Sequence, residues 1–351
     1  MVQSAKELNH AHVIYLSPTR SIHDLRFVRL FERSGALVTV IDSKNTDFDM
    51  QSILDFASAN EYPISNRAKV LITGPLVLDQ SQLKSFDIPV IGISWAFDIM
   101  RDSIRNPNEL LKLKQSLNFY HQIVVDNNAS LRILVALGYP ENKILNFPWG
   151  VEEARDSSTC QKSSLNLRMG EEKIILSPRS LLPHYNQDLV LRAFKLVLAS
   201  HPYSKLVLID DDYNNRKLLE GIAETLGIAE QIIWLPFSQE SQTEDWIADS
   251  DVIVSAASTD GSSVTILQAM KLGIPVVTSA TLGSASWIFD GITGFTFGAG
   301  NERGCAEAII RALDSDNDQV ISNAQELIAA KAHWPQVATP LLESIKLLTT
   351  N

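Results

Sequence analysis

The sequence predicts an α/β protein made of two doubly wound halves, each a parallel sheet covered by helices. Short apolar runs alternate with amphipathic helical patterns along the chain, and this alternation is typical of parallel sheets with helices on both faces. A polar stretch over residues 152–172, rich in Ser and charged residues, interrupts the alternation once. Two such halves joined by a polar segment predict two Rossmann-like domains.

Each half contains six apolar runs of the length expected for a buried strand. In the first half the runs are 13–16, 38–41, 70–72, 90–93, 123–125 and 144–147. In the second half they are 174–176, 206–209, 232–235, 252–254, 276–277 and 295–297. We therefore expect an N-terminal domain over 1–151, a linker over 152–172, a C-terminal domain over 173–333 and a last helix over 334–351.

Length and composition suit a globular protein of two domains. The chain has 351 residues, of which 45% are hydrophobic, and each half is long enough to bury its own core. No apolar run approaches the roughly 18 residues of a membrane span, and the first residues are polar, without an apolar signal core. We expect a cytoplasmic protein in which the two cysteines, Cys160 and Cys305, are reduced thiols.

The net charge of −11 is unevenly distributed. Residues 1–150 carry 15 basic and 15 acidic side chains, so the remainder carries the whole excess. This balance argues against a nucleic-acid partner, which would require a basic face. Four arginines fall within residues 20–33. We favour the solvated face of an amphipathic helix over a peripheral membrane patch, because stable docking needs a larger cluster.

The most informative segment is a βαβ unit over residues 251–279. An apolar strand leads into a polar loop over 258–263, then a helix over 264–272, and a second strand follows with two residues of turn. Free amides and the positive end of a helix dipole converge at such loops, which therefore bind anions. Gly261 allows close approach of a ligand, and Ser262 or Ser263 can cap the helix.

This segment resembles the donor-binding motif of the retaining glycosyltransferases of family 4, in group 1, which have the GT-B fold. That family has an acidic residue and a Gly before the helix, and a second acidic residue eight positions after the first. Asp260, Gly261 and Gln268 occupy these positions. The family has Glu at both acidic positions; Asp260 keeps the charge, whereas Gln268 keeps only an acceptor oxygen. The resemblance implies that Asp260 contacts the donor sugar and Gln268 its ribose.

A second matching position lies after the strand at 174–176. The family has an Arg there and a Lys several residues later, which together hold the donor pyrophosphate. Arg179 matches the Arg, and His184 or Tyr185 stands at the Lys position. Arg suits phosphate because its planar fork donates hydrogen bonds in pairs; the alternative is a surface Arg paired with Asp188. The resemblance implies a donor phosphate site made by Arg179, His184 and the amides of Gly261, Ser262, Ser263 and Val264.

In the first half, Asp98 resembles an acidic residue that related enzymes place near the reacting carbon of the sugar. An N-cap of the following helix is an equally good interpretation. His23 follows the first strand and its loop and would face the acceptor side, although a lone His is more often structural. The segment 210–212 reads Asp-Asp-Asp. Asp210 and Asp212 match a metal-binding pattern of another fold, but acidic residues are ordinary at a helix start, so we expect no metal and no cofactor.

Together these resemblances imply a GT-B enzyme with two domains facing across a cleft and a C-terminal helix that crosses back to the N-terminal domain. It would move a hexose from a nucleoside diphosphate sugar to a glycan, lipid-linked or small-molecule acceptor, with Asp260, Asp98 and Arg179 at the reaction centre. The alternatives are a sugar-nucleotide epimerase or hydrolase, and a non-catalytic partner subunit. We further expect Arg179→Ala to leave folding nearly unchanged and Gln268→Glu to tighten donor binding or leave it unchanged.

Overall fold

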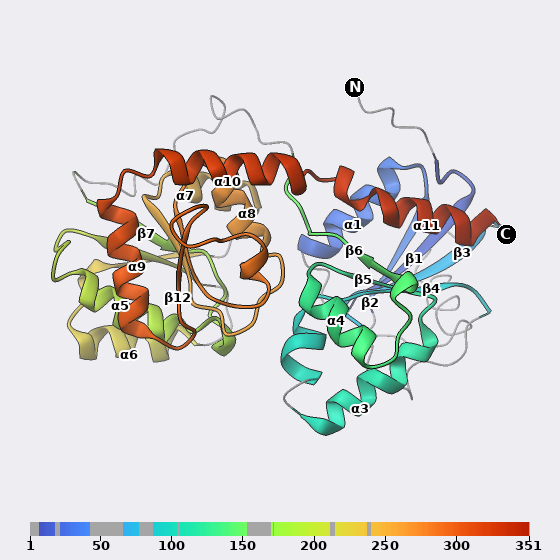
Figure 1. Cartoon of the computed structure of the whole chain (residues 1–351), viewed down its shortest axis with the longest axis horizontal. Helices are drawn as coiled ribbons and strands as arrows, with labels where there is room; N and C mark the ends of the chain where they lie inside the picture. The colour runs from blue at the N-terminus through green and yellow to red at the C-terminus, as the bar shows by residue number, and fades with distance from the viewer. Residues whose placement is uncertain are drawn as a thin grey trace. The chain divides into compact units, whose positions relative to one another are not determined.

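The computed structural model describes residues 7–17, 22–42, 66–76, 87–103, 106–152, 170, 172–210, 215–236 and 240–350. The chain divides into two compact units, shown in Figure 1. The first contains Met1–Pro148 and Pro335–Asn351, and the second contains Trp149–Trp334. None of the helices built from these described residues has the length and apolar character needed to cross a membrane.

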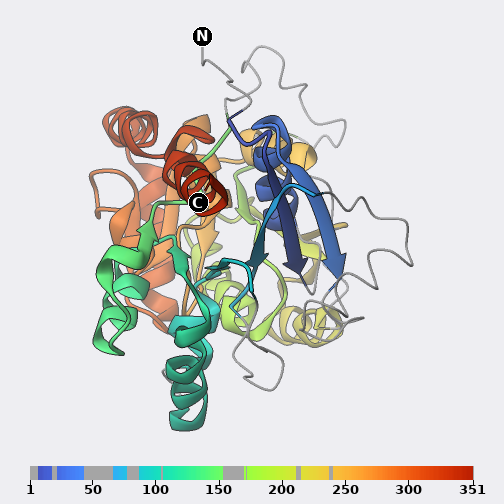
Figure 2. The same ribbon diagram turned by 90° about the vertical axis from the view of Figure 1, so that its right-hand side faces the viewer.

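The first unit contains a six-stranded parallel sheet with the order β2-β1-β3-β4-β5-β6. Its strands are β1 Ala11–Ser17, β2 Leu37–Asp42, β3 Ala68–Thr73, β4 Val90–Ile93, β5 Gln122–Val125 and β6 Ile144–Asn146. The blue arrows of β1 and β2 run in the same direction in Figure 2. The strand β2 lies on one side of β1, whereas β3 and the strands that follow it lie on the other side. The direction in which strands are added to the sheet therefore reverses between β1 and β3.

Helices cover both faces of this first sheet. They are α1 Ile22–Arg33, α3 Pro107–Ser116, α4 Asn128–Ala136 and α11 Thr339–Thr350, together with the π-helical η1 Phe97–Ser103. Residues of η1, α3 and α4 share one apolar core with Ile14 and Leu71 of the sheet. The α1 residue Phe31 packs against Tyr15 on the opposite face, with ring centroids 6.4 Å apart. The C-terminal α11 contacts β1 and β3, and His10 Nε2 lies 3.0 Å from its Thr349 hydroxyl.

The second unit contains another six-stranded parallel sheet, with the order β12-β11-β10-β7-β8-β9. Its strands are β7 Ile174–Ser177, β8 Lys205–Asp210, β9 Ile232–Pro236, β10 Val252–Ser255, β11 Val276–Ser279 and β12 Phe295–Phe297. Its helices are α5 Gln187–Val197, α6 Arg216–Leu226, α7 Glu240–Ala248, α8 Val264–Leu272, α9 Glu302–Asp314 and α10 Asp318–Lys331.

Both faces of the second sheet are buried, as expected for a parallel sheet. Ile175 packs with α5, α6 and α9 in one core, whereas its neighbours Ile174 and Leu176 pack with α7, α8 and α10 in the other. Figure 1 shows these two groups of helices on opposite sides of the sheet. Successive side chains of a strand point to opposite faces, so continuous apolar runs are required to fill both cores.

The fold class predicted from the sequence is confirmed. Among the described residues, eleven of the twelve predicted apolar runs lie within a strand and the run 144–147 extends one residue beyond β6; the helix predicted over 264–272 is α8. That helix ends at Gly273, whose φ of 77° lies in the left-handed region favoured by glycine at helix C-termini. Cys305 is a buried free thiol in α9, and Cys160 lies outside the described residues.

A buried histidine makes the stability of the first unit sensitive to pH. His12 lies in β1, and its Nε2 is 2.8 Å from the Thr39 hydroxyl of β2. Burial, together with the nearby positive charges of Lys69 and Arg67, lowers the pKa of His12 to about 4. The folded protein therefore keeps His12 neutral at pH values where the unfolded chain is protonated.

We expect the unfolding free energy to fall as the pH is lowered from about 6.5 towards 4, because the unfolded state then binds the extra proton. For this group alone the loss between pH 7 and pH 5 is roughly 2 kcal/mol. Urea unfolding of the wild type and His12→Gln, compared at both pH values, measures it. Gln does not titrate and can still bond to Thr39, so equal pH dependence of the two proteins would contradict the prediction.

Candidate functional site

The second sheet places a candidate site at the carboxyl ends of β7 and β10. Successive strands run outwards from this pair in opposite directions, from β7 to β8 and β9 and from β10 to β11 and β12. Ligands of open α/β sheets bind outside the carboxyl ends of the strands at such a switch point. Arg179 follows β7 directly, and the loop over 256–263 follows β10.

Arg179 is held by groups from both segments. Its side chain is only 9% exposed, and its Nη2 lies 2.9 Å from Asp260 Oδ2. Its Nη1 donates a hydrogen bond to the Ser263 hydroxyl. The guanidinium carbon lies 4.2 Å from the ring centroid of Tyr185, a cation–π contact. Arg179 does not form the surface pair with Asp188 that the sequence left open as an alternative. Asp188 pairs with Arg192 instead, at 2.6 Å.

The ion pair determines the charge of this site. Burial disfavours the charged form of Arg179, but the Asp260 carboxylate and the Tyr185 phenol outweigh burial, and the pKa of Arg179 is raised above its ordinary value. Burial also raises the pKa of Asp260, and the guanidinium opposes that shift. Removing one partner of such a pair leaves the other charge uncompensated, at a cost of about 3–5 kcal/mol when the pair is fully buried.

The loop before α8 contains the predicted anion-binding residues. The Gly261 amide donates to Asp260 Oδ1 at 3.1 Å, and Trp287 Nε1 donates to the Ser262 hydroxyl at 3.1 Å. Ser263 is the N-cap residue of α8 but makes no side-chain capping bond. The prediction that the Ser263 hydroxyl caps this helix is therefore wrong, and this hydroxyl accepts a hydrogen bond from Arg179 instead. The first turn of α8, beginning at Val264, keeps its capacity to bind an anion.

The loop is packed tightly against the backbone at Gly283. A Cβ atom at this position would lie 2.1 Å from the Asp260 carbonyl oxygen and 2.6 Å from that of Gly261. Both atoms belong to the backbone, so no rotation of a side chain could relieve the contact. Gly283 immediately precedes the short helix η6 Ser284–Ser286, and its lack of a Cβ atom permits this close contact with the loop.

Gln268 lies on the second turn of α8 and is 6% exposed. Its Nε2 donates to Glu244 Oε1 of α7 at 3.1 Å. The sequence pointed to Gln268 but not to Glu244, because the two residues belong to different helices. The position where the resembling family has a Glu therefore has a carboxylate as its immediate neighbour.

His184 and Tyr185 form the helix η4 Pro183–Tyr185, and their rings are 4.1 Å apart between centroids. The His184 carbonyl accepts from the Ser258 amide at 2.8 Å. This bond joins the segment after β7 to the segment after β10. Arg179, His184, Asp260, Gly261, Ser262, Ser263 and Val264 therefore lie around one sheet edge, as the sequence predicts, with Tyr185 as a further member.

Asp98 and His23 lie in the first unit. Asp98 is 2% exposed, and its carboxylate accepts from the Ser94 hydroxyl at 2.6 Å and from the Leu76 amide at 2.9 Å. Burial raises its pKa, and these hydrogen bonds partly offset the shift. Asp98 lies inside the π-helix η1, and its carboxylate also accepts a hydrogen bond from the amide of the next residue, Ile99. His23 is half-buried on α1, edge-on to the Trp95 indole at 5.8 Å.

Asp210 is the last residue of β8 and the described member of the acidic segment 210–212. Asp210 accepts from Arg216 at 2.7 Å, Arg216 also bonds to Glu220, and its guanidinium lies over the Trp234 ring. Asp212 lies outside the described residues. In the part of the chain that the structure describes, no group of three or more His, Cys, Asp or Glu side chains could hold a metal ion.

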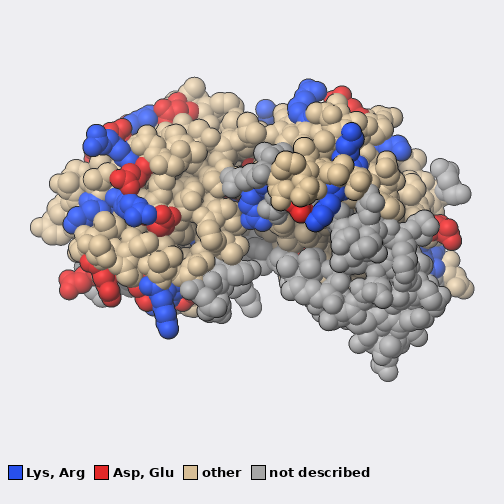
Figure 3. All heavy atoms as spheres, turned by 90° about the horizontal axis from the view of Figure 1, so that it is seen from below, with Lys and Arg blue, Asp and Glu red and all other residues tan. Residues whose placement is uncertain are grey.

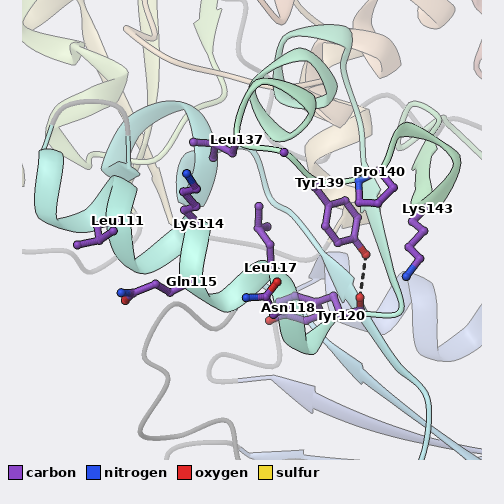
Figure 4. Close-up of a pocket in the computed structure, with 11 residues that line it drawn as sticks. Leu111, Lys114, Gln115, Leu117, Asn118, Tyr120, Leu137, Tyr139, Pro140 and Lys143 are labelled. Carbon is purple, nitrogen blue, oxygen red and sulfur yellow. Dashed lines mark hydrogen bonds between the residues drawn. The ribbon is translucent and has the colours of Figure 1, made fainter.

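A cavity of about 540 Å³ lies elsewhere, in the first unit. It is formed by the segments before β5 and β6, at the amino ends of these strands, and the Tyr139 hydroxyl points to the Tyr120 carbonyl at 2.9 Å (Figure 4). Lys114 and Lys143 contribute to its lining. It is distinct from the carboxyl-end site.

Acidic and basic side chains are interspersed on the described part of the face shown in Figure 3.

Comparison with curated proteins identifies relatives with modest identity. The chain is 23% identical over 234 residues to an uncharacterized glycosyltransferase of Methanocaldococcus jannaschii, covering 64% of this chain and 59% of that protein. It is 29% identical over 185 residues to a lipopolysaccharide 1,2-N-acetylglucosaminetransferase of Salmonella typhimurium, covering 49% of this chain and 48% of that protein. The chain thus spans about half the length of these relatives.

Solved structures are similar over almost the whole chain. Anabaena HepE in complex with UDP-glucose matches with a TM-score of 0.73 at 15% identity, covering 96% of this chain and 99% of HepE. Sucrose-phosphate synthase from Thermosynechococcus elongatus matches with a TM-score of 0.75 at 14% identity, covering 97% and 99%. Residues 162–327 match the family model of the glycosyl transferases group 1. Over these residues the chain is similar to the glycosyl transferases group 1, and it has the GT-B fold of these solved structures.

Proposed function

We propose that this protein transfers a sugar from a nucleoside diphosphate sugar to a glycan, lipid-linked or small-molecule acceptor, with retention of anomeric configuration and in the cytoplasm. The observation that carries the proposal is the meeting of Arg179 with the loop before α8, where Nη2 lies 2.9 Å from Asp260 Oδ2. The Arg179 guanidinium can donate paired hydrogen bonds to phosphate oxygens, and the N-terminus of α8 attracts negative charge. Both lie where ligands of open α/β sheets bind, so the site suits a diphosphate. The complex of HepE with UDP-glucose supports the same ligand class.

Each residue has a distinct task in this proposal. Arg179 and the amides at the start of α8 stabilise the charge that develops on the leaving diphosphate. Arg179 is paired with Asp260, so a diphosphate that binds to the guanidinium competes with that carboxylate. Once displaced, Asp260 is available to the hydroxyls of the donor sugar and helps to position the reacting carbon. Gln268 contacts the ribose, while Asp98 and His23 contribute to the acceptor side.

The same ion pair favours a second candidate function, that of a non-catalytic partner subunit. Asp260 neutralises the Arg179 charge, and His184 and Tyr185 occupy the position where the resembling family has a Lys. Neither side chain supplies the ammonium group of a Lys, so the phosphate site has a reduced positive charge. Such a protein would bind a nucleotide without turning over its sugar.

The decisive experiment incubates the protein with UDP-, GDP- and ADP-glucose and a panel of acceptors. Nucleoside diphosphate release and glycoside formation are measured together, and the product anomer is assigned by NMR. The transferase proposal expects both products in equal amounts with the anomeric configuration of the donor. Binding without release supports the partner subunit, and an inverted product contradicts retention.

We expect this activity to need no metal. The Asp210 carboxylate is engaged by Arg216, and the diphosphate charge is met by Arg179 and the helix dipole instead. Activity should therefore survive an excess of EDTA, and Asp210→Asn should change turnover by less than about twofold, as for an exposed surface pair. Loss of activity on chelation that manganese restores would contradict the metal-free mechanism.

A further inference from the structure

The carboxylate of Glu244 lies directly beside Gln268. Gln268 Nε2 donates to Glu244 Oε1 at 3.1 Å, and this contact links α7 to α8. Gln268 is buried and Glu244 is half-buried. A partly buried carboxylate loses hydration, so its hydrogen-bond partners have to compensate for the lost water.

Both residues are placed to serve the carboxyl edge of the second sheet. Glu244 is the fifth residue of α7 and Gln268 the fifth residue of α8. Each therefore lies about 6 Å along its helix axis from the first residue. These helices follow β9 and β10, so each begins at the carboxyl edge. Helical side chains tilt towards the helix N-terminus, which directs both groups back towards that edge.

The pair offers the acceptors that a vicinal diol requires. A diol presents two O–H donors, and the Gln268 carbonyl oxygen and the Glu244 carboxylate can each accept one. A carboxylate has about four acceptor positions, so it can hold the Gln268 amide and a hydroxyl together. Because Glu244 takes the Gln268 amide, the orientation of the Gln268 carbonyl oxygen is fixed. The bond to the carboxylate is charge-assisted and therefore the stronger of the two.

We propose that Glu244, held by Gln268, supplies the carboxylate that binds the ribose diol of the nucleotide. This inference rests on the proposed function, because it takes the ligand of the edge to be a nucleoside diphosphate. The ribose is the next group after the diphosphate, and Gln268, which contacts Glu244, lies about one helical turn from the first residue of α8. Gln268 then acts as a positioning residue and as the neutral acceptor.

One consequence reverses the expectation drawn from the sequence for Gln268→Glu. That substitution would set two carboxylates about 3 Å apart, the present separation of the two side chains, and like charges at this distance repel strongly. We therefore expect it to weaken nucleotide binding rather than to tighten it. Moving the charge from one helix to the other, as in the double variant Glu244→Gln with Gln268→Glu, restores a single carboxylate.

The test measures binding of UDP, GDP and ADP, and of their 2′-deoxy and 3′-deoxy forms, by calorimetry. The proteins are the wild type, Glu244→Gln, Gln268→Glu, the double variant and Glu326→Gln. Glu326 is exposed on α10 and controls for the chemical change alone. Thermal unfolding of each variant without nucleotide checks that the fold is retained.

For the nucleotide that binds the wild type, Glu244→Gln should weaken binding of the ribose form about tenfold. The same substitution should weaken binding of the deoxy forms less than about twofold. Gln268→Glu should weaken binding at least as much, and the double variant should return to within about threefold of the wild type. Unchanged ribose preference in Glu244→Gln, or a double variant as weak as the two losses combined, would overturn this inference alone. Absence of binding by the wild type to all three nucleotides would overturn the proposed function, and this inference with it.

Discussion

Replacing Arg179 by Ala is expected to weaken nucleoside diphosphate binding by roughly 10- to 150-fold, equivalent to about 1.5–3 kcal/mol for a hydrogen bond to a charged group. Calorimetric titration with UDP, GDP and ADP measures the change. Arg192→Ala is the matched control, because Arg192 forms an exposed pair with Asp188 on the neighbouring α5. Nucleotide affinity equal to that of the wild type would remove Arg179 from the site.

Asp260→Asn should act in the opposite direction on the same titration. It removes the carboxylate that lies 2.9 Å from Arg179 Nη2, so the guanidinium no longer has to be released from an ion pair. A nucleoside diphosphate, which carries no sugar for Asp260 to contact, should then bind as well as before or more tightly. Turnover of a nucleoside diphosphate sugar should fall, because Asp260 is proposed to position the sugar. Parallel losses of diphosphate affinity in both variants would contradict this competition.

The structure also changes the expected effect of Arg179→Ala on folding. The sequence suggested almost none, but the side chain is 9% exposed and pairs with Asp260, Ser263 and Tyr185. We now expect a clear loss of stability, because the substitution leaves Asp260 without its partner in a desolvated position. Thermal unfolding of Arg179→Ala and of the double variant with Asp260→Asn separates this loss from the loss of binding.

Replacing Gly283 by Ala is expected to have the second large effect. The added Cβ would approach the Asp260 carbonyl oxygen to 2.1 Å, so the loop before α8 has to move. Overpacking of this kind costs about 1–3 kcal/mol of stability. Displacing the loop by a few tenths of an ångström or more also misplaces Asp260 and the first amides of α8. We expect a lower unfolding temperature and at least about a tenfold loss of nucleotide affinity, in keeping with the steep cost of misplaced binding groups.

Gly221→Ala provides the matched control for this substitution. Gly221 lies inside α6, and a Cβ there would meet no atom within 4 Å. The same chemical change should therefore stabilise the protein by up to about 1 kcal/mol, because Ala favours a helix over Gly. If Gly283→Ala keeps the stability and the nucleotide affinity of the wild type, the proposed position of the loop is wrong.

The strands could be predicted because their signal is local. A strand buried on both faces has to be apolar at every position, and the helices between strands keep a polar face. The carboxyl-end location of Arg179 and Asp260 also followed from the sequence, since each comes soon after a predicted strand. Strand order was not needed for that prediction. The neighbouring positions of β7 and β10 then bring together two residues that are 81 positions apart.

The contacts inside the site could not be predicted, because they depend on how separate elements pack. Nothing in the sequence near Gln268 identifies Glu244 as its partner, since α7 and α8 meet only in the folded unit. The role of Gly283 depends on an approach of two backbone segments. Ser is a residue type that often caps helices, but the Ser263 hydroxyl accepts a hydrogen bond from Arg179 instead. The sequence allowed Asp98 to be either a helix N-cap or a site residue, and the structure adds one hydrogen bond to it from the amide of the distant Leu76.

We propose that the carboxyl ends of β7 and β10 bind a nucleoside diphosphate. Hydrogen–deuterium exchange of the whole chain, with and without UDP, GDP and ADP at saturating concentration, tests this binding site. At least one nucleotide should slow exchange in the peptides covering residues 177–185 and 256–268, where backbone amides lie around Arg179 and the start of α8. Slower exchange confined to other parts of the chain, or unchanged exchange with all three nucleotides, would contradict it.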